Sequence, residues 1–467
     1  MTLFRTGDPR PIHFMGIAGA GMSALALIAR HRGVAINGCD ADTSGTGTED
    51  HTSLGVRVWR GHEPSHVDGA RAVVVTAAVP KDHPELERAR ALNVPIIRRA
   101  DALGQLVASG SLVAVAGTHG KTTTTVMVTE ALTAAGRSPT GLAGGRVAAW
   151  GGNARLGGED LFVVEADEYD KAFLSLHPTV AVVNNVEADH LECYGSVDAL
   201  EDAFAEFAGR AQRVIVGADD AGADRVALRV TAPVWRVGIG PTADVRIRAV
   251  RLEPSGSRAT VSLPGGTTVE LQLAVPGMHN VRNAAAALAA LHALGADVLA
   301  GSRALAEFHG VGRRFERLGE AGGVTIVDDY AHHPTEVAAT LSAARQAFPG
   351  RRVVAVFQPH LYSRTALHGE ALGKALAAAD VVVVAPIYGA REQPMAGVTH
   401  HLVVRGATRA GAATVAVRDR AGLTTHVARA VREGDVVFTL GAGDVTKVGP
   451  ELLKILGNGS REQGAVA

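Results

Sequence analysis

The sequence predicts an α/β protein with three domains, each built on a mainly parallel β-sheet. The chain has 467 residues, and a typical domain of roughly 150 residues would allow about three. Short apolar runs alternate with amphipathic segments along most of the chain, a pattern typical of parallel strands covered by helices. Several of these runs are followed by residues that can bind ligands, as expected at the carboxyl ends of parallel strands. We expect the domains to span residues 1–107, 108–312 and 313–467.

The composition excludes several classes of protein. Apolar residues make up 47% of the chain and the formal net charge is −1, which argues against a general nucleic-acid binder. The two cysteines, Cys39 and Cys193, are far apart, so neither a disulfide framework nor a zinc ribbon is indicated. The N-terminus lacks a signal-peptide pattern, and no apolar run approaches about 18 residues. We therefore expect a soluble cytoplasmic protein that does not interact with a membrane.

The first hundred residues predict a Rossmann-like domain. A short apolar strand at 12–15 leads into a glycine-rich turn, and from Gly19 the sequence matches G-x-G-x-x-A, a turn that binds diphosphates. Asp40 follows the second predicted strand, 34–38, at the distance expected for an acid that binds a ribose. This motif alone fits a nicotinamide, flavin or UDP-sugar site, or a turn without a ligand.

A second glycine turn opens the central domain and predicts a nucleoside triphosphate site. The apolar strand 112–116 is followed by the loop and helix start Gly117, Thr118, His119, Gly120, Lys121, Thr122 and Thr123. In such a P-loop-type turn, backbone N–H groups and the helix dipole favour phosphate, the lysine reaches the outer phosphates and the threonine binds Mg²⁺. Val115 stands where the common pattern has glycine, so this is a shortened variant. The alternative is an ordinary strand–turn–helix junction.

Two acidic clusters follow neighbouring predicted strands of the central domain. Residues 165–170 follow the strand 161–164, and residues 184–190 follow the strand 179–183. We expect Glu165 and His190 to hold Mg²⁺, which takes few protein ligands and keeps phosphate oxygens and waters. The other acids of the first cluster, Asp167, Glu168 and Asp170, are equally consistent with helix caps.

The end of the central domain departs from the parallel pattern. Residues 245–250, 259–263 and 268–273 alternate apolar and polar side chains, which predicts antiparallel hairpins added to the parallel sheet. Asn280 and Asn283 follow, three residues apart on one face of a predicted helix. They either bind a nucleotide base or cap the helix.

The C-terminal domain is also predicted to be Rossmann-like. Its expected strands share an apolar, valine-rich character and lie at 324–327, 353–357, 381–384 and 436–440. Polar side chains follow these strands, among them Asp329, His332, His360 and Arg364. They suggest a binding edge that faces the nucleotide domain. A metal site at the histidine pair His332 and His333 is the weaker alternative.

Taken together, these motifs resemble those of the Mur ligases, the ATP-dependent amide-bond-forming enzymes of bacterial peptidoglycan synthesis. The matching segments are 13–23, 117–123, 165–170, 184–190, 277–283, 328–336 and 358–365. The run Gly-Thr-His-Gly-Lys-Thr-Thr points to a superfamily that includes folylpolyglutamate synthetases. The N-terminal glycine run and Asp-Asp-Tyr-Ala-His-His-Pro narrow the resemblance to the alanine-adding branch. A related ligase that recycles whole tripeptides shares part of the pattern.

The resemblance implies a role for each motif. Residues expected to bind the UDP-sugar are Gly16, Gly19, Gly21, Met22, Ser23, Asp40 and Ser44. Residues expected to bind ATP are Gly117 to Thr123, Asn280, Asn283 and Asp329. The expected metal ligands are Thr122, Glu165 and His190. The amino acid and the γ-phosphate are expected at His332, His360 and Arg364. The expected catalytic residues are Lys121, His190, His332 and Arg364.

The implied reaction joins L-alanine to the lactyl carboxylate of UDP-N-acetylmuramate. The carboxylate attacks the γ-phosphate of ATP to give an acyl phosphate, which the amine of L-alanine then attacks. A base must accept the proton of the amine, and the sequence leaves His332 and His190 open. We expect a monomer or a homodimer. Two alternatives remain: a nucleotide-driven switch, and a nicotinamide dehydrogenase, which would leave the Lys-Thr loop unexplained.

Overall fold

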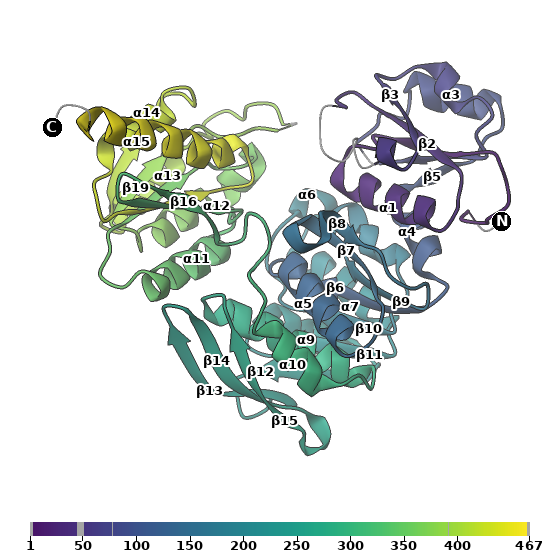
Figure 1. The fold of residues 1–467 in the computed structure, drawn as a ribbon, viewed down its shortest axis with the longest axis horizontal. Helices are drawn as coiled ribbons and strands as arrows, with labels where there is room; N and C mark the ends of the chain where they lie inside the picture. The colour runs from purple at the N-terminus through teal and green to yellow at the C-terminus, as the bar shows by residue number, and fades with distance from the viewer. Residues whose placement is uncertain (1–2, 44–50, 77, 391, 465–467) are drawn as a thin grey trace. The chain divides into compact units, whose positions relative to one another are not determined.

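The computed structural model describes residues 3–43, 51–76, 78–390 and 392–464 (Figure 1). These residues form two compact units. The first comprises Met1–Arg248, Thr260–Leu271 and Arg282–Ala306, and the second comprises Ala249–Ala259, Gln272–Val281 and Glu307–Ala467. Three β-sheets are present, which confirms the predicted α/β class.

The N-terminal sheet has five strands in the order β3-β2-β1-β4-β5, and all neighbours are parallel. The strands are β1 (Ile12–Met15), β2 (Ile36–Asp40), β3 (Arg57–Arg60), β4 (Ala72–Val75) and β5 (Ile96–Arg98). The helices are α1 (Ala20–His31), η1 (Pro64–Val67), α3 (Pro84–Ala91) and α4 (Arg99–Val107). This order, with β1 in the centre, is the predicted Rossmann-like arrangement.

The central sheet has ten strands in the order β15-β14-β13-β12-β11-β10-β6-β9-β7-β8. The strands are β6 (Ser111–Ala116), β7 (Thr140–Val147), β8 (Gly152–Arg155), β9 (Leu161–Glu165), β10 (Val180–Val183), β11 (Arg213–Gly217), β12 (Val234–Gly238), β13 (Val245–Glu253), β14 (Gly256–Ser262) and β15 (Thr268–Leu273). The helices are α5 (Lys121–Ala134), η2 (Ala148–Trp150), η3 (Tyr169–Ser175), α6 (Leu191–Tyr194), α7 (Val197–Gly209), α8 (Ala221–Arg229), η4 (Pro264–Gly266), α9 (Met278–Ala293) and α10 (Val298–Leu305). The central strand β6 is parallel to both of its neighbours, β9 and β10.

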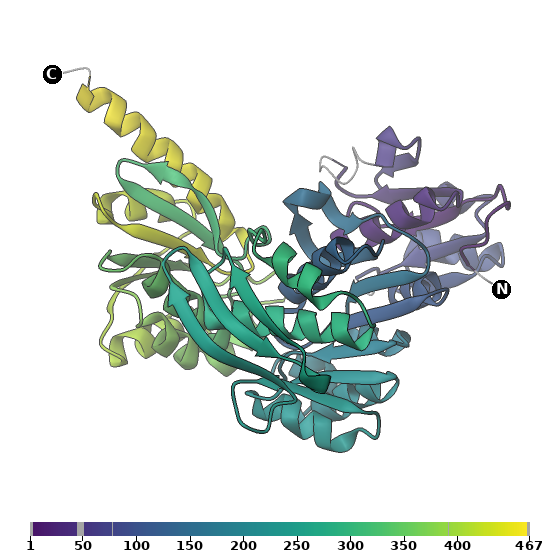
Figure 2. The same ribbon diagram turned by 60° about the horizontal axis from the view of Figure 1, so that its bottom comes forward.

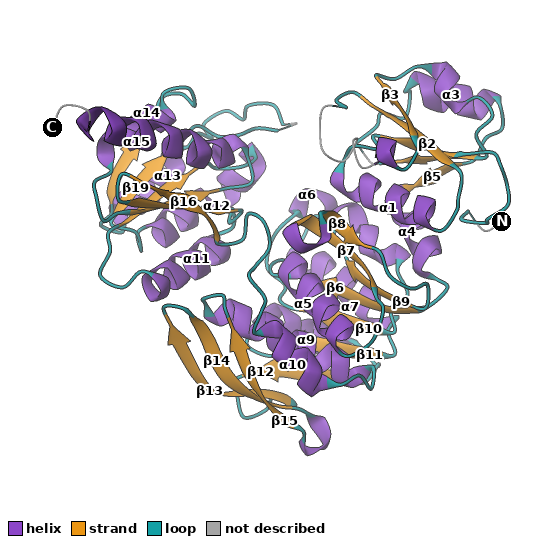
Figure 3. Ribbon diagram, viewed as in Figure 1, coloured by secondary structure: helices purple, strands orange, loops and turns teal. Residues whose placement is uncertain are grey.

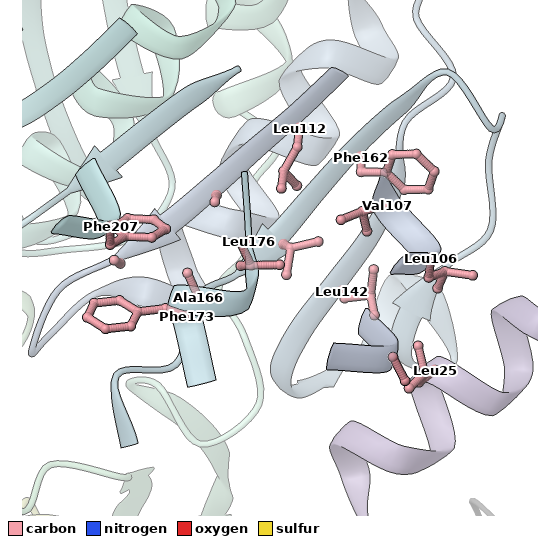
Figure 4. Close-up of a cluster of buried hydrophobic side chains, with 14 of the residues drawn as sticks. Leu25, Leu106, Val107, Leu112, Leu142, Phe162, Ala166, Phe173, Leu176 and Phe207 are labelled. Carbon is pink, nitrogen blue, oxygen red and sulfur yellow. The ribbon is translucent and has the colours of Figure 1, made fainter. Parts of the chain in front are cut away.

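One buried apolar cluster joins the N-terminal and central sheets of the first unit (Figure 4). Leu25 of α1 and Leu106 of α4 belong to the same cluster as Leu142 of β7 and Phe162 of β9, and α1 lies beside β7 and β8. Each such side chain contributes about 1.5–3 kcal/mol when it is fully buried. The shared core keeps the two sheets in one unit, and the domain boundary near residue 107 stays a prediction.

The sheet of the second unit has six strands in the order β16-β17-β21-β18-β19-β20. The strands are β16 (Glu316–Ala321), β17 (Val324–Asp329), β18 (Val353–Phe357), β19 (Val381–Val384), β20 (Ala413–Ala416) and β21 (Val436–Leu440). The helices are α11 (Pro334–Ala347), α12 (Tyr362–Leu376), α13 (His401–Arg409), α14 (Leu423–Ala430), η5 (Asp444–Lys447) and α15 (Val448–Gly464). Only β16 among these strands is antiparallel to its neighbour.

Helices cover both faces of this sheet (Figure 3). On one face α11, α12 and α13 contribute Leu341, Leu372 and Val403 to a buried cluster, and on the other α14 and α15 contribute Leu423 and Leu452 to a second. Beyond this face, α15 continues as a long helix towards the C-terminus (Figure 2). Among the helices of the described residues, none is both long enough and apolar enough to cross a membrane.

Candidate functional site

The loop between β6 and α5 has a backbone that requires glycine at two positions. Gly117 has φ +134° and Gly120 has φ +77°, both in the left-handed region. A Cβ atom on Gly117 would lie 3.1 Å from the backbone nitrogen of Asn184, and one on Gly120 would lie 2.7 Å from Oδ1 of Asn283. A side chain at either position would therefore strain the loop, and one at Gly120 would also collide with Asn283.

Residues that follow β10 brace this loop. Asn185 accepts the backbone N–H of His119 at its Oδ1 (2.7 Å) and that of Thr118 at its carbonyl oxygen (3.0 Å). Glu187 donates its backbone N–H to the hydroxyl of Thr118 (2.9 Å), and its carboxylate lies 3.1 Å from Nε2 of His119. Neither Asn185 nor Glu187 is assigned a role from the sequence, although both belong to the polar run after β10.

The first turn of α5 offers an anion-binding helix start. Gly120 is the N-cap residue of α5, and among the described residues no side chain accepts a hydrogen bond from the first N–H groups of this helix. Its first turn carries no acidic residue. The N–H groups and the positive end of the helix dipole therefore favour phosphate oxygens. Thr122 and Thr123 lie in this turn and are buried. The structure places all seven predicted loop residues at this strand–helix junction.

Lys121 folds back over the loop that precedes it. Its Nζ donates hydrogen bonds to the carbonyl oxygen of Gly117 (2.7 Å) and to Oε1 of Glu168 (2.8 Å). Burial alone would lower the pKa of Lys121, but nearby carboxylates, Glu168 first among them, outweigh burial and raise it. The lysine therefore carries its positive charge beside the phosphate loop.

Glu168, for which the sequence is equally consistent with a site residue and a helix cap, is buried beside Lys121. It lies just before η3, its side chain is 4% exposed, and burial raises its pKa although Lys121 opposes that effect. Oε2 of this carboxylate is buried without a hydrogen-bond partner in the described residues. Unsatisfied buried carboxylate oxygens are uncommon, so this atom is a candidate contact for a ligand. The alternative role, a solvent-exposed carboxylate that caps a helix, does not fit a side chain this deeply buried.

Glu165 ends one of the two strands that flank β6, and His190 follows the other. Glu165 is the last residue of β9, and its Oε2 accepts the backbone N–H of Gly144 at 2.5 Å. His190 lies beyond β10 with φ +53°, and its Nδ1 lies 3.4 Å from Oε1 of Glu192. Because β9, β6 and β10 are parallel neighbours, both residues lie at the sheet edge that carries the phosphate loop. Their oxygen and nitrogen atoms suit a divalent cation, but metal binding stays a prediction.

The N-terminal glycine turn is closed by contacts from β2. The backbone N–H of Gly16 donates to the carbonyl oxygen of Cys39 (2.8 Å), and that of Ala18 donates to Oδ2 of Asp40 (3.0 Å). Gly19 caps α1 through its backbone, and no acidic residue lies in the first turn of this helix. Asp40 therefore helps to fix the conformation of the turn beside which it is predicted to bind the UDP-sugar.

A cavity of about 310 Å³ connects this turn to the central sheet within the first unit. Its lining comprises Gly19, Ala20, Gly21, Met22, Ala24, Leu25, Thr76, Arg99, Leu103, Leu142, Ala143, Gly144, Val164, Glu165 and Asp167. Arg99 was not predicted from the sequence. A Cβ atom on Gly21 would lie 2.8 Å from the guanidinium of Arg99, whose Nη2 is 3.9 Å from the carboxylate of Asp167. The cavity thus combines a helix start, a cation and an acidic edge.

The remaining residues predicted for the UDP-sugar differ in position. Met22 lies in the buried core beneath the turn and also lines the cavity. Ser23 is buried, and its hydroxyl lies 3.0 Å from Nε2 of His51. Ser44 lies outside the described residues. The part played by each of these residues in binding stays a prediction.

Asp329 ends β17 in the second unit. Its two carboxylate oxygens accept the backbone N–H groups of Phe315 (2.7 Å) and Ala331 (2.8 Å). Burial raises the pKa of Asp329 to about 6, against the opposing effects of Arg314 and these hydrogen bonds. The carboxylate that was predicted to hold a ribose also fixes the loop after its own strand.

The second unit brings three other predicted residues together. The rings of His332 and His360 are 6.3 Å apart, and Nη1 of Arg364 is 3.3 Å from Nδ1 of His360. His332 follows β17, and the other two residues follow β18, which lies on the opposite side of β21. Nδ1 of His332 lies 2.9 Å from the carbonyl oxygen of Tyr330, so this nitrogen carries a hydrogen, and it also lies 3.3 Å from Oε2 of Glu336.

The two asparagines of α9 have different surroundings, although both are buried. Asn283 lies against the phosphate loop, close to Gly120. Asn280 donates its side-chain N–H to the carbonyl oxygen of Pro276 (2.7 Å), four residues earlier. Of the two side chains, only Asn283 has a described contact with the nucleotide loop.

Comparisons with known proteins agree with this arrangement. Three family models match: "Mur ligase family, catalytic domain" over residues 11–110, "Mur ligase middle domain" over 115–291 and "Mur ligase, glutamate ligase domain" over 313–443. The chain is 45% identical, over 96% of each sequence, to the UDP-N-acetylmuramate–L-alanine ligase of Thermobifida fusca.

Solved structures give the same family. The UDP-N-acetylmuramate–alanine ligase of Thermotoga maritima aligns with a TM-score of 0.78 at 29% identity, over 97% of this chain and 99% of that chain. A murein peptide ligase of Psychrobacter arcticus aligns with a TM-score of 0.72 at 27% identity, over 96% and 99%. The sequence relatives and the shared fold together show that this chain belongs to the Mur ligase family.

Proposed function

We propose that this protein joins L-alanine to the lactyl carboxylate of UDP-N-acetylmuramate, with ATP and Mg²⁺, in peptidoglycan precursor synthesis. The observation that carries the proposal is the cavity of the first unit, because the N-terminal glycine turn and Glu165 line the same space. A sugar nucleotide held at the turn by its diphosphate would extend towards the edge that carries the phosphate loop. The alanine-ligase relatives, at 41–46% identity, support the choice of substrates.

The first step activates the carboxylate. A carboxylate oxygen attacks the γ-phosphorus of ATP, an O–P bond forms, and the bond to ADP breaks, which leaves an acyl phosphate. The N–H groups at the start of α5 and Lys121 stabilise the charge on the transferred phosphoryl group, a task of positioning and electrostatics. Mg²⁺ would neutralise further charge on the phosphate oxygens, and we assign Thr122, Glu165 and His190 to hold it.

The second step forms the amide. The neutral amine of L-alanine attacks the acyl carbon, and the tetrahedral intermediate expels phosphate. We assign the proton of the amine to the imidazole of His332, whose ring is oriented by the hydrogen bond from Nδ1 to the Tyr330 carbonyl oxygen. His360 and Arg364 are assigned to the amino acid carboxylate and the phosphate, for which a buried guanidinium is well suited.

The remaining assignments concern the nucleotide. Asn283 is assigned to ATP because it lies against Gly120. Asn280 and Asp329 are assigned to the adenine and ribose on the family resemblance. In the first unit Arg99 joins the residues assigned to UDP, because a guanidinium beside a glycine turn favours a diphosphate.

A product assay tests the proposal. The full-length protein is incubated with ATP, Mg²⁺, UDP-N-acetylmuramate and one of L-alanine, glycine, L-serine or the tripeptide L-alanyl-γ-D-glutamyl-meso-diaminopimelate. We expect one amide, one ADP and one phosphate per turnover with L-alanine, and little product with the tripeptide. Efficient use of the tripeptide with poor use of alanine would assign the chain to the peptide-recycling reaction. ATP hydrolysis at the same rate with and without the sugar nucleotide would overturn the proposal altogether.

A further inference from the structure

A cluster of metal-binding side chains is buried on the other face of the N-terminal sheet. His13 of β1, Cys39 of β2 and Glu85 of α3 are each 0% exposed, and one donor atom from each lies within 4.8 Å of the others. The face carries the apolar cluster of Met15, Leu86 and their neighbours, away from the α1 side that lines the cavity. None of the three has a part in the reaction described above.

The donor atoms of His13, Cys39 and Glu85 are spaced as three ligands of one ion, with Nε2 of His13 lying 3.9 Å from Oε2 of Glu85. Sγ of Cys39 lies 3.3 Å from Nε2 of His13, 3.2 Å from Nδ1 of His62 and 3.3 Å from each carboxylate oxygen of Glu85. Nδ1 of His62 is 3.5 Å from Oε2 of Glu85. Ligands at the usual zinc distances, about 2.3 Å for sulfur and about 2.0–2.1 Å for nitrogen, would lie roughly 3.3–3.6 Å apart.

Neighbouring residues orient these donors as outer partners do in metal sites. Nδ1 of His13 lies 2.9 Å from the side-chain oxygen of Asn37, so it carries the hydrogen and leaves Nε2 free to coordinate. Oε1 of Glu85 is 2.9 Å from Nδ1 of His66 and accepts the backbone N–H of Glu63 (3.0 Å). These contacts occupy one oxygen of Glu85 and leave Oε2 facing the cysteine.

We propose that His13, Cys39 and Glu85 bind one Zn²⁺ ion, and that the ring of His62, which lies outside this group of three, turns towards the ion as the fourth ligand. Thiolate and imidazole donors select zinc over magnesium, so the ion is distinct from the Mg²⁺ of the reaction. Glu85 is fully buried, and an ion beside Oε2 would add to the compensation that His66 supplies at Oε1. The side chain of His62 is 27% exposed and gives the ion a route from solvent.

The zinc site would stabilise the N-terminal glycine turn. The carbonyl oxygen of Cys39 accepts the backbone N–H groups of Gly16 (2.8 Å) and Ile17 (3.1 Å). An ion on the side chain of Cys39 therefore fixes the strand end that closes the turn. We expect bound zinc to raise the melting temperature, because it binds only the folded site.

The test uses cobalt as a spectroscopic probe in the chelator-treated, full-length protein without nucleotides. The Cys193→Ser variant contains one cysteine, Cys39, so any thiolate-to-cobalt charge-transfer band in this variant must come from the proposed site. We expect the wild type and this variant to bind one Co²⁺ with that band, and one equivalent of Zn²⁺ to abolish it. Cys39→Ser should lose the band, and zinc should no longer raise its melting temperature.

Two results would overturn the proposal. One is the absence of a thiolate band from Cys193→Ser, which holds whether or not Cys39→Ser folds. The other is an unchanged band in Cys39→Ser, since the sulfur would then belong to Cys193. Replacing the exposed His177 by glutamine is the matched control for His62→Gln, and only the latter should weaken cobalt binding.

Discussion

The first unit contains two glycine turns that share a backbone design and differ in charge. Each joins a central parallel strand to a helix start that lacks a side-chain cap, β1 to α1 and β6 to α5. The turn at α1 has a helix start without charged side chains and meets Arg99 across the cavity. The turn at α5 starts with Lys121, which is paired with Glu168.

The difference in charge distinguishes a turn that binds phosphates from a turn that transfers one. A helix start with glycines can bind a diphosphate by its N–H groups, and at the first turn Arg99 adds a positive charge from α4. Phosphoryl transfer needs charge stabilisation in the transition state, which a buried lysine can supply. We therefore assign the first turn to the substrate that keeps its phosphates and the second to the substrate that loses one.

The largest expected effect is that of Lys121→Ala. Removal of the buried cation should lower the rate of ADP formation by roughly 10³-fold or more, because a charged donor to the transferring phosphate is lost. A coupled assay of ADP release measures the rate. Lys374→Ala, which changes an exposed lysine of α12, is the control and should retain the wild-type rate. Equal rates for the two variants would show that Lys121 takes no part in the reaction.

Glu168→Gln should have the next largest effect. Glu168 raises the pKa of Lys121 against burial, so the variant should lower that pKa and Lys121 should lose its proton at a lower pH. The alkaline fall of kcat/KM should therefore begin at a lower pH than in the wild type, with a loss of roughly 10–100-fold above that point. Glu159→Gln, at a carboxylate 67% exposed, should leave the profile unchanged. An unshifted alkaline limb in Glu168→Gln would contradict the role of the pair.

Gly144→Ala tests the metal side of the second turn. A Cβ atom on Gly144 would lie 2.5 Å from Oε1 of Glu165, so the carboxylate must move. We expect the Mg²⁺ concentration for half-maximal activity to rise about tenfold, since magnesium tolerates little change in ligand geometry. Gly152→Ala on the neighbouring strand has open space around its Cβ and is the control. An unaltered Mg²⁺ requirement in Gly144→Ala would mean that Glu165 is not a ligand.

The smallest effect concerns the first turn. Arg99→Ala should weaken binding of UDP-N-acetylmuramate about fivefold, because a partly exposed guanidinium contributes about 1 kcal/mol to an anion. Isothermal titration without ATP measures this affinity. Arg98→Ala removes the adjacent arginine, which pairs with Asp101 at the surface, and should bind as the wild type does. If both variants bound equally, Arg99 would not contact the diphosphate.

Much of the fold could be predicted because its central strands are apolar and buried on both faces. The predicted strands 112–116 and 324–327 differ from β6 and β17 by one and two residues at an end. The strands β3, β7 and β16, which lie at or next to a sheet edge, were missed for a physical reason. β3 and β16 are short or polar and largely exposed, and β7 contains three glycines, so their sequences lack an apolar pattern.

The site was predictable where a local motif carries the chemistry and was missed where the chemistry depends on tertiary contacts. The Gly-Lys-Thr run identifies the phosphate loop because backbone, lysine and hydroxyl are adjacent in sequence. Arg99 reaches the first turn from α4. Glu168 accepts a hydrogen bond from Lys121, although the two residues are 47 positions apart in the sequence. No local pattern distinguishes these side chains from solvated charges.

The division of labour between the two turns is tested most directly by titrating both ligands into two variants. UDP-N-acetylmuramate and a non-hydrolysable ATP analogue are each titrated into Lys121→Ala and into Gly19→Val, whose side chain blocks approach to the first turn. The account predicts a crossed result: Lys121→Ala binds the sugar nucleotide normally and the ATP analogue weakly, and Gly19→Val does the reverse. Loss of sugar-nucleotide binding in Lys121→Ala, with the ATP analogue unaffected, would contradict it.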